Sequence, residues 1–295
     1  MTVAADNTSD VERVLRRHSA LSSIRRWPIN LRIGTVIVAI IVLLAVFAPV
    51  LTPHNPIVGN FQATLLPPSW AHPMGTDELG RDVWTRTLYA ARTDLQLGLI
   101  MTYVPLAYGL MLGVIVGFLG GWFDRLLMRL VDIAIAFPFL VLIIVIVAIL
   151  GPGIKNMYIA VFCVGWTMYC RLGRADMLVI REQEYLLAAR ALGFGSWRII
   201  FRHALPNLLA ASLVFSMADV VLNILLASSL SFLGMGVQPP TPEWGAIVAE
   251  GRNFMLQAWW ISTLPGIAII VTGLGFSLVG VGLASMLGRR YVQTL

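Results

Sequence analysis

The chain has 295 residues, of which 58% are hydrophobic and 12% are charged, and its mean hydropathy is +0.82. Soluble domains carry about twice that share of charged residues, so this composition excludes a soluble protein and indicates an integral membrane protein. The formal net charge is +6, but the sequence lacks the aromatic and basic pattern of a nucleic-acid interface; we expect the lipid bilayer, and no nucleic acid, as a partner.

Six segments are long and apolar enough to cross a bilayer, since a membrane helix needs about 20 apolar residues. They are residues 31–51, 95–119, 126–150, 157–170 with flanks, 208–233 and 259–287. The fourth is the least apolar, because Arg171 and Arg174 make one of its ends polar. The sequence therefore predicts an all-α, polytopic membrane protein with six transmembrane helices.

The basic residues predict the orientation of these helices. If the amino terminus is inside, sixteen of the 21 lysine and arginine residues fall on the inner side, which is the bias that cytoplasmic loops show. The predicted plan is one six-helix domain, 31–290, between a cytoplasmic amino-terminal segment, 1–30, and a cytoplasmic tail, 291–295. Within it, the loops 52–94 and 235–258 are exterior, and the loop 174–207 is cytoplasmic.

The first exterior loop contains a polar motif, HPMGTDELGRDVWTR, at residues 72–86. Thr76 and Asp77 are suited to cap a helix that begins at Glu78, and Asp82 and Arg86 are expected to pair one helical turn apart. A solvated, capped helix that only anchors the second span is the alternative. The candidate residues of this motif are Gly75, Thr76, Asp77, Gly80, Arg81, Asp82 and Arg86.

The predicted spans contain a glycine stripe and two acids. Glycines recur every four residues from Gly109 to Gly121, which lets another helix approach closely; a glycine-rich span without a packing role is the alternative. Asp132 and Asp219 lie within spans, where a charge is costly and usually functional. We expect Asp132 to pair with Arg129, whereas Asp219 can face either a pathway or a neighbouring helix.

A polar, arginine-rich segment lies between the fourth and fifth spans. Residues 188–192 are strong helix formers, and Gly193 is suited to end a short helix. The small alanine side chains would let a partner protein approach closely, while the arginines stay solvated or pair with its acidic groups. An ordinary basic cytoplasmic loop is the alternative.

This segment resembles the cytoplasmic coupling loop of the permease subunits of bacterial ABC importers, in which a Glu-Ala-Ala triplet precedes a glycine and a Leu-Pro pair. The matching positions are Ala188, Ala189, Gly193, Leu205 and Pro206, while Leu187 stands where the pattern has glutamate. The motif at 72–92 and the stretches 124–138 and 231–245 resemble the second transmembrane subunit of dipeptide, oligopeptide and nickel importers. Residues 277–285 lack the charges that this branch usually has there.

The resemblance implies a type I ABC importer permease in a bacterial inner membrane, with both termini cytoplasmic. It implies as partners a second homologous permease, two ATPase subunits and an exterior substrate-binding protein. The chain itself is expected to be non-catalytic and to bind no cofactor or metal, with ATP and Mg²⁺ in the ATPase subunits. Its single lysine, Lys155, excludes a Walker A loop. The implied ATPase-coupling residues are Glu184, Leu187, Ala188, Ala189, Arg190, Gly193, Leu205 and Pro206.

The cargo and the energy source have alternatives. Di- or oligopeptides are favoured over nickel, because the four histidines, His18, His54, His72 and His203, are scattered over predicted loops. Ser216, Met217, Asp219 and Phe276 are candidates for the substrate path. A permease for another small solute is the alternative within the family. A proton-coupled secondary transporter that uses Asp132 or Asp219 is the alternative from another class, and an intramembrane enzyme lacks any recognisable catalytic motif.

Overall fold

The computed structural model of this chain describes residues 27–293, with side chains described as far as residue 287. The predicted amino-terminal segment therefore lies outside the described residues up to residue 26, as do the last two residues of the predicted tail. Within the described range the chain is almost entirely helical, and an isolated antiparallel bridge between Thr76 and Asp82 is the β-type pairing there. The predicted all-α class is confirmed.

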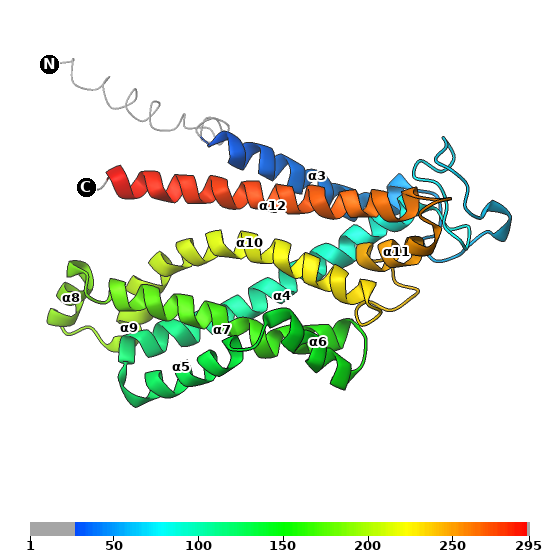
Figure 1. Cartoon of the computed structure of the whole chain (residues 1–295). Helices are drawn as coiled ribbons and strands as arrows, with labels where there is room; N and C mark the ends of the chain where they lie inside the picture. Colours follow the sequence, from blue (N-terminus) through cyan, green and yellow to red (C-terminus); the bar gives the residue numbers. More distant parts are fainter. Residues whose placement is uncertain (1–26, 294–295) are drawn as a thin grey trace, which may run out of the picture.

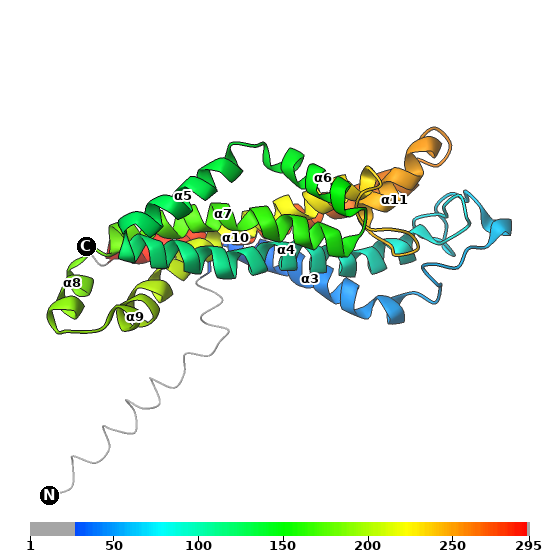
Figure 2. The same cartoon turned by 90° about the horizontal axis from the view of Figure 1, so that it is seen from below.

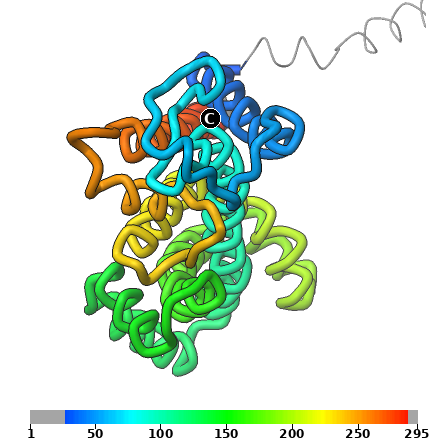
Figure 3. The backbone as a smooth tube through the Cα atoms, turned by 90° about the vertical axis from the view of Figure 1, so that its right-hand side faces the viewer, coloured from blue at the N-terminus to red at the C-terminus, as the bar shows by residue number. Residues whose placement is uncertain are grey.

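Most of the long helices run along one axis of the molecule (Figure 1). They are α3 (Ile29–Leu51), α4 (Val83–Leu119), α5 (Gly121–Ile135), α6 (Phe139–Leu150), α7 (Ile154–Ile180), α10 (Leu205–Phe232) and α12 (Trp260–Gln293). Short elements lie at the two ends of the bundle: η1 (Phe61–Ala63), α8 (Glu184–Ala191), α9 (Ser196–Arg198), η2 (Ile199–Ala204), α11 (Trp244–Gly251) and η3 (Arg252–Phe254). Figure 3 shows α3 beside α12 at one edge of the bundle and α5 with α6 at the opposite edge.

Among the described residues, four helical segments are long and apolar enough to cross a membrane: α3, α4, the continuous stretch Ser196–Phe232, and α12. The pair α5–α6 meets the same criterion as one span bent by 85°. Helix α7 has 27 residues and lies along α4 (Figure 2), but its charged residues lower its hydropathy. The structure is compatible with six passes, and the count itself stays a prediction.

Long helices extend into two of the predicted loops, 52–94 and 174–207. Helix α4 begins at Val83, because the Asp82 side chain caps it by accepting the Thr85 N–H at 2.7 Å. The last part of the predicted exterior loop 52–94 is therefore helical. On the other side, α7 continues to Ile180 and α10 begins at Leu205, so both ends of the predicted cytoplasmic loop 174–207 are helical.

The bend between α5 and α6 lies at Pro138. This residue has an extended backbone, with φ −58° and ψ 122°, and it precedes the first residue of α6. Proline has no N–H for the preceding helix and clashes with its carbonyl groups, so α5 ends before it. The bend leads α6 away from the direction of α5 (Figure 2), and it shapes the cavity described below.

The predicted glycine stripe is confirmed at the contact between α4 and α7. A Cβ atom built on Gly109 would lie 2.5 Å from the Trp166 carbonyl oxygen, and one on Gly113 would lie 2.1 Å from the Cys170 carbonyl oxygen. Only glycine permits the two backbones to come this close. The fourth glycine of the stripe, Gly121, is outside this contact: it begins α5 with a φ of +78° and open space around it.

Candidate functional site

The α8 helix lies at one tip of the molecule, beyond the ends of the long helices (Figure 1). Gly193 terminates it as predicted, with a φ of +77°. The Gly193 N–H donates to the Arg190 carbonyl at 2.9 Å, and the Phe194 N–H donates to the Ala189 carbonyl at 3.1 Å. These two bonds form a Schellman motif, which glycine stabilises because it adopts positive φ without steric cost. The helix begins at Glu184, earlier than the predicted start at 188.

One face of α8 packs on its own chain and the other is free. Leu186 and Ala189 are buried in a cluster with residues of α4, α7 and η2, whereas Glu184, Leu187 and Ala188 are exposed. Of the two matched alanines, Ala189 therefore serves internal packing and Ala188 is available to a partner. Exposed apolar side chains at this tip, of a kind that marks interaction surfaces, are Tyr185, Leu187, Leu192 and Trp197.

The arginines near α8 lie over aromatic rings. The Arg190 guanidinium is 4.7 Å from the ring centroid of Phe118 at the end of α4, and the Arg198 guanidinium is 4.9 Å from that of Phe194. The Arg190 contact holds α8 to the bundle, whereas the Arg198 contact is local to the turn before α9. Both arginines are nevertheless exposed, so the prediction that they stay solvated or pair with acidic groups of a partner stands.

Leu205 and Pro206 form the start of α10. The preceding turn, η2, is a π-helix, in which the Leu205 N–H donates to the carbonyl of Ile200. Pro206 follows at the second helical position, where its missing N–H costs little. The Asn207 side-chain amide donates to the Tyr185 hydroxyl at 3.2 Å, so the Leu-Pro pair is connected to α8 through its neighbour.

A cavity of about 560 Å³ lies between the α5–α6 bend, α7 and α10. Its wall is mostly apolar, with Asp219 as its acidic group. The Asp219 carboxylate accepts the Tyr169 hydroxyl at 2.7 Å and the Asn223 amide at 3.2 Å. Large apolar side chains of the wall come from all these elements: Phe137, Phe139, Met168, Phe215 and Leu222.

The four candidate path residues are not in one place. Asp219 lines this cavity. Ser216 and Phe276 are buried in the chain's own packing, with exposed fractions of 0% and 7%, and Met217 packs against the cluster that contains Phe276. Of the four, Asp219 is the residue that lines this cavity, and Met217 is half-buried.

The partner of Asp132 differs from the predicted one. Its carboxylate forms an ion pair with Arg171 on α7, across the contact between α5 and α7, and not with Arg129 on its own helix. A second pair of the same kind joins Asp124 to Arg174, with Nε–Oδ1 and Nη2–Oδ2 distances of 2.5 and 2.7 Å. Asp132 and Arg171 are both about half exposed, so this pair adds little stability.

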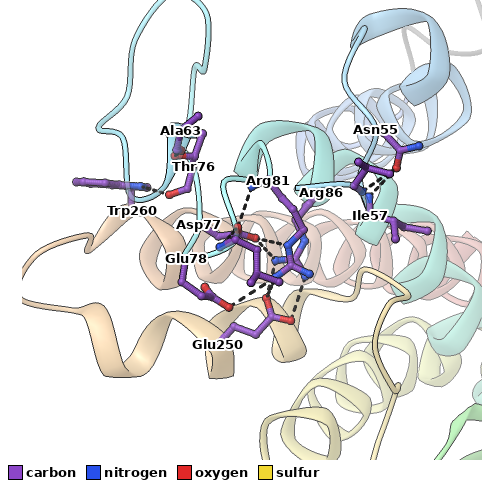
Figure 4. Close-up of polar contacts among 12 residues, drawn as sticks. Asn55, Ile57, Ala63, Thr76, Asp77, Glu78, Arg81, Arg86, Glu250 and Trp260 are labelled. Carbon is purple, nitrogen blue, oxygen red and sulfur yellow. Dashed lines mark hydrogen bonds and ion pairs between the residues drawn. The ribbon is translucent and has the colours of Figure 1, made fainter. Parts of the chain in front are cut away.

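At the opposite tip, an ion-pair network joins the exterior motif to Glu250, near the end of α11 (Figure 4). The buried Asp77 accepts Arg81 Nε at 2.7 Å and Arg86 Nη1 at 2.6 Å. Both arginines also donate to Glu250, from Arg81 Nη2 at 2.9 Å and from Arg86 Nη2 at 3.1 Å. Nearby, partial burial raises the pKa of the Glu78 carboxyl above its ordinary value.

Two expectations for this motif are wrong. Thr76 and Asp77 do not cap a helix at Glu78, because residues 78–79 form a turn, in which Asp77 Oδ1 accepts the Leu79 and Arg81 N–H groups at 3.0 and 2.9 Å. The Thr76 hydroxyl donates to the Ala63 carbonyl at 2.5 Å. Asp82 does not pair with Arg86. It caps α4 through one carboxylate oxygen, and the other lies 2.9 Å from the His72 Nδ1 atom.

The two glycines of the motif let the loop fold back on itself. Gly75 and Gly80 have φ angles of +71° and +69°. A Cβ atom on Gly80 would lie 1.8 Å from the Asn60 carbonyl oxygen. The arrangement of the motif within this chain is thus structural, and it fixes the loop against α11 and the start of α12.

Sequence reasoning missed a buried polar cluster beneath α11. Glu243 caps this helix by accepting the Gly245 and Ala246 N–H groups at 2.9 and 2.7 Å. Asp94 of α4 accepts the Trp244 N–H at 3.0 Å, and the Ser228 hydroxyl donates to Glu243 at 3.0 Å. An acid directly before a helical run was the available signal for Glu243. Glu250 was also missed, and no local pattern marks its distant arginine partners.

Comparisons with known proteins agree with this architecture. Residues 109–293 match the family described as "Binding-protein-dependent transport system inner membrane component", and residues 32–68 match the "N-terminal TM domain of oligopeptide transport permease C". The chain is 42% identical over 258 residues to the dipeptide transport system permease protein DppC of Alkalihalophilus pseudofirmus, covering 88% of this chain and 85% of that protein.

Two further relatives have nearly the same sequence identity to this chain. The probable D,D-dipeptide transport system permease protein DdpC of Escherichia coli is 40% identical over 257 residues, which are 87% of this chain and 86% of the relative. The glutathione transport system permease protein GsiD of Pectobacterium atrosepticum is 40% identical over 223 residues, which are 76% of this chain and 74% of the relative.

Proposed function

The chain belongs to the family of inner membrane components of binding-protein-dependent transport systems, and from this premise we propose that it is an ABC importer permease subunit for di- or oligopeptides. The observation that carries the proposal is α8, a short helix at one tip with one buried face and one free apolar face. The relatives named for dipeptides, D,D-dipeptides and glutathione support a peptide cargo.

The free face of α8 is the docking surface for an ATPase subunit. Leu187, where the family pattern has glutamate, is 44% exposed, so this contact rests on apolar packing more than on charge. Leu186, on the opposite face, is fully buried against the cluster that includes α4 and α7. A displacement of α8 by an ATP-driven closure would therefore be transmitted to the long helices. ATP and Mg²⁺ are bound by the ATPase subunits, and this chain is non-catalytic.

The opposite tip is the docking surface for an exterior substrate-binding protein. Trp70 in the first exterior loop and Leu256 after η3 are fully exposed there. The ion-pair network of Asp77, Arg86 and Glu250 holds these loops in place, because buried, paired charges fix relative geometry. The family motif thus presents a rigid surface through which a loaded binding protein can release its cargo.

The cavity beside Asp219 is one wall of the substrate path, and a second, homologous permease supplies the other wall. A path for peptides needs weakly polar walls and an acceptor for the peptide's amino group, and Asp219 with its apolar surroundings provides both. The residues lining this cavity include no histidine or cysteine, which are the ligands that nickel favours. The cavity therefore suits a peptide better than a metal ion.

The cargo is tested in the reconstituted complex of this chain, the second permease, the ATPase subunits and the binding protein. We expect peptide-loaded binding protein to stimulate ATP hydrolysis. Asp219→Asn keeps the size of the side chain but removes its charge, so we expect peptide uptake to fall about tenfold, the equivalent of about 1.4 kcal/mol. Asp132→Asn is the matched control, because Asp132 pairs with Arg171 outside the cavity, and we expect it to leave uptake unchanged.

Three outcomes would contradict this proposal. If nickel-loaded binding protein stimulates ATP hydrolysis and no peptide mixture does, the cargo is nickel and not a peptide. Equal uptake in Asp219→Asn and Asp132→Asn would remove Asp219 from the path. Uptake driven by a proton gradient without ATPase subunits would favour a secondary transporter.

The α8 tip is cytoplasmic and the 52–82 loop is exterior in this proposal, which places the chain as a multi-pass protein in a bacterial inner membrane with both termini inside. The two tips lie at opposite ends of the bundle (Figure 1). In a variant whose Cys163 and Cys170 are replaced by alanine, cysteines at the exposed positions Ser196 and Ala71 should react with an impermeant thiol reagent from opposite sides of the membrane. Reaction of both from the same side would refute this topology.

A further inference from the structure

Two histidines meet where the outer end of α3 faces the beginning of α4. His54 follows α3, and His72 belongs to the first exterior loop. Their ring centroids are 5.1 Å apart, with planes inclined by 32°. One nitrogen atom of each ring and one oxygen atom of Asp82 all lie within 4.8 Å of one another. The sequence placed these histidines eighteen residues apart in a loop and indicated no ligand role for them.

Asp82 determines which nitrogen of His72 is available. One of its carboxylate oxygens accepts the Thr85 N–H and hydroxyl at 2.7 and 2.6 Å, and the other lies 2.9 Å from His72 Nδ1. A carboxylate only accepts hydrogen bonds, so Nδ1 carries the proton. In the neutral ring, Nε2 then has the free lone pair. A carboxylate that fixes a histidine ring in this way is the usual support of a metal-binding histidine.

We propose that His54 and His72 bind a divalent transition-metal cation of the zinc or nickel type at the exterior tip, with Asp82 as the residue that positions His72. Imidazole nitrogen suits these ions. Metal–nitrogen distances of about 2.0–2.1 Å require two ligand nitrogens to lie close together, and the exposed His54 side chain is free to rotate toward His72. Water molecules complete the coordination, since the site opens to the outside.

The position of this site gives the ion a structural effect. His54 lies two residues after Thr52, whose hydroxyl contacts the Thr85 hydroxyl at 2.5 Å, and Asp82 caps α4. A bound cation would therefore fasten the outer end of α3 to the beginning of α4.

A second cluster of possible metal ligands at this tip consists of carboxylates that are already paired with cationic side chains. Asp77, Glu78 and Glu250 also have carboxylate oxygens close to one another. Arg81 and Arg86 already occupy them as ion-pair partners, and two arginines would repel a cation. The histidine pair is thus the better metal site, because no cationic side chain contacts it among the described ion pairs.

The test uses the full chain in lipid nanodiscs after removal of any polyhistidine tag. Zn²⁺, and separately Ni²⁺, is titrated in competition with a chromophoric chelator. We expect one high-affinity ion per chain, and at least a tenfold weaker affinity in His54→Ala and in His72→Ala. His203→Ala is the matched control, because His203 stacks on Phe194 near the opposite tip, and it should bind as the wild type does.

Thermal unfolding provides a second readout that does not depend on transport. Zn²⁺ should raise the unfolding temperature of the wild-type chain and of His203→Ala but not that of His54→Ala, because a ligand stabilises only the state that binds it. His54 is exposed, so its replacement should leave folding intact even if His72→Ala, which loses its contact with Asp82, does not fold. Equal zinc affinity in the wild type and His54→Ala would overturn the proposal, as would a wild-type chain that binds no zinc.

Discussion

Replacing Gly113 by alanine should sharply lower the yield and thermal stability of the folded chain. The added Cβ atom would lie 2.1 Å from the Cys170 carbonyl oxygen and 2.9 Å from the Arg174 nitrogen. Both atoms belong to the α7 backbone, so the two helices must separate rather than let a side chain rotate away. We expect a loss of about 3 kcal/mol, the upper end of the range for overpacking, measured as thermal unfolding of the purified chain in detergent.

The matched control is Gly266→Ala on α12. Gly266 is also helical, but a Cβ atom there has no neighbour within 4 Å. Alanine is the better helix former by about 1 kcal/mol, so this variant should be as stable as the wild type or slightly more stable. If Gly113→Ala unfolds at the same temperature as Gly266→Ala, the α4 and α7 backbones do not approach each other this closely at Gly113.

Replacing Arg86 by methionine should release the exterior loop. The Arg86 side chain is 2% exposed and pairs with Asp77, which is 0% exposed. Removing one partner of a buried pair leaves an uncompensated buried charge, which costs about 3–5 kcal/mol. We expect the lower end of that range, because Arg81 still binds Asp77. The loss should appear as a lower unfolding temperature and as faster proteolysis within residues 52–82.

Arg252→Ala serves as the control for Arg86→Met. Arg252 is exposed and lies 5.9 Å from the Phe232 ring centroid, so its loss should cost less than about 1 kcal/mol. Arg86→Lys should give an intermediate result, since lysine keeps the charge but not the forked guanidinium. Unchanged proteolysis of Arg86→Met would show that this network does not hold the exterior loop.

Local signals were sufficient for much of the fold. Apolar runs predicted the long helices, since a bilayer requires a minimum apolar length. Gly193 predicted the end of α8 because positive φ is a property of the residue itself, and the spacing from Gly109 predicted a close helix contact. Each of these features depends on residues near one another in the chain.

Features that depend on distant partners could not be predicted. Arg86 was expected to bind Asp82, four residues before it, but Glu250 comes from α11 and competes successfully. Asp132 likewise binds Arg171 of a neighbouring helix instead of Arg129. The sequence predicted that Asp77 would cap a helix beginning at Glu78, but the capped helix is α4, and Asp82 is its cap. Asp77 is buried and forms ion pairs with Arg81 and Arg86.

The cavity was also beyond sequence reasoning. Its shape follows from the 85° angle between α5 and α6. Pro138 explains why the helix breaks there, but the direction of α6 depends on its packing against α7. Asp219 could be identified as an acid within a span, yet only the structure places it in the cavity and Ser216 and Phe276 outside it.

In the function proposed above, ATP hydrolysis drives this permease through α8. Substitution of Gly193 is the most direct test of this coupling. Gly193→Pro removes an N–H that donates to Arg190 and cannot adopt the φ of +77°. Gly195→Ala, two residues further on, has open space and no positive φ, so it is the matched control. Both chains should insert into the membrane, because neither residue contacts the bundle.

We measure ATP hydrolysis by the reconstituted complex with and without substrate-loaded binding protein. In Gly195→Ala, the loaded binding protein should stimulate hydrolysis as it does in the wild type. In Gly193→Pro, the stimulation should be lost and the ATPase subunits should dissociate more readily. Normal stimulation and normal ATPase association in Gly193→Pro would contradict the assignment of α8 as the coupling helix.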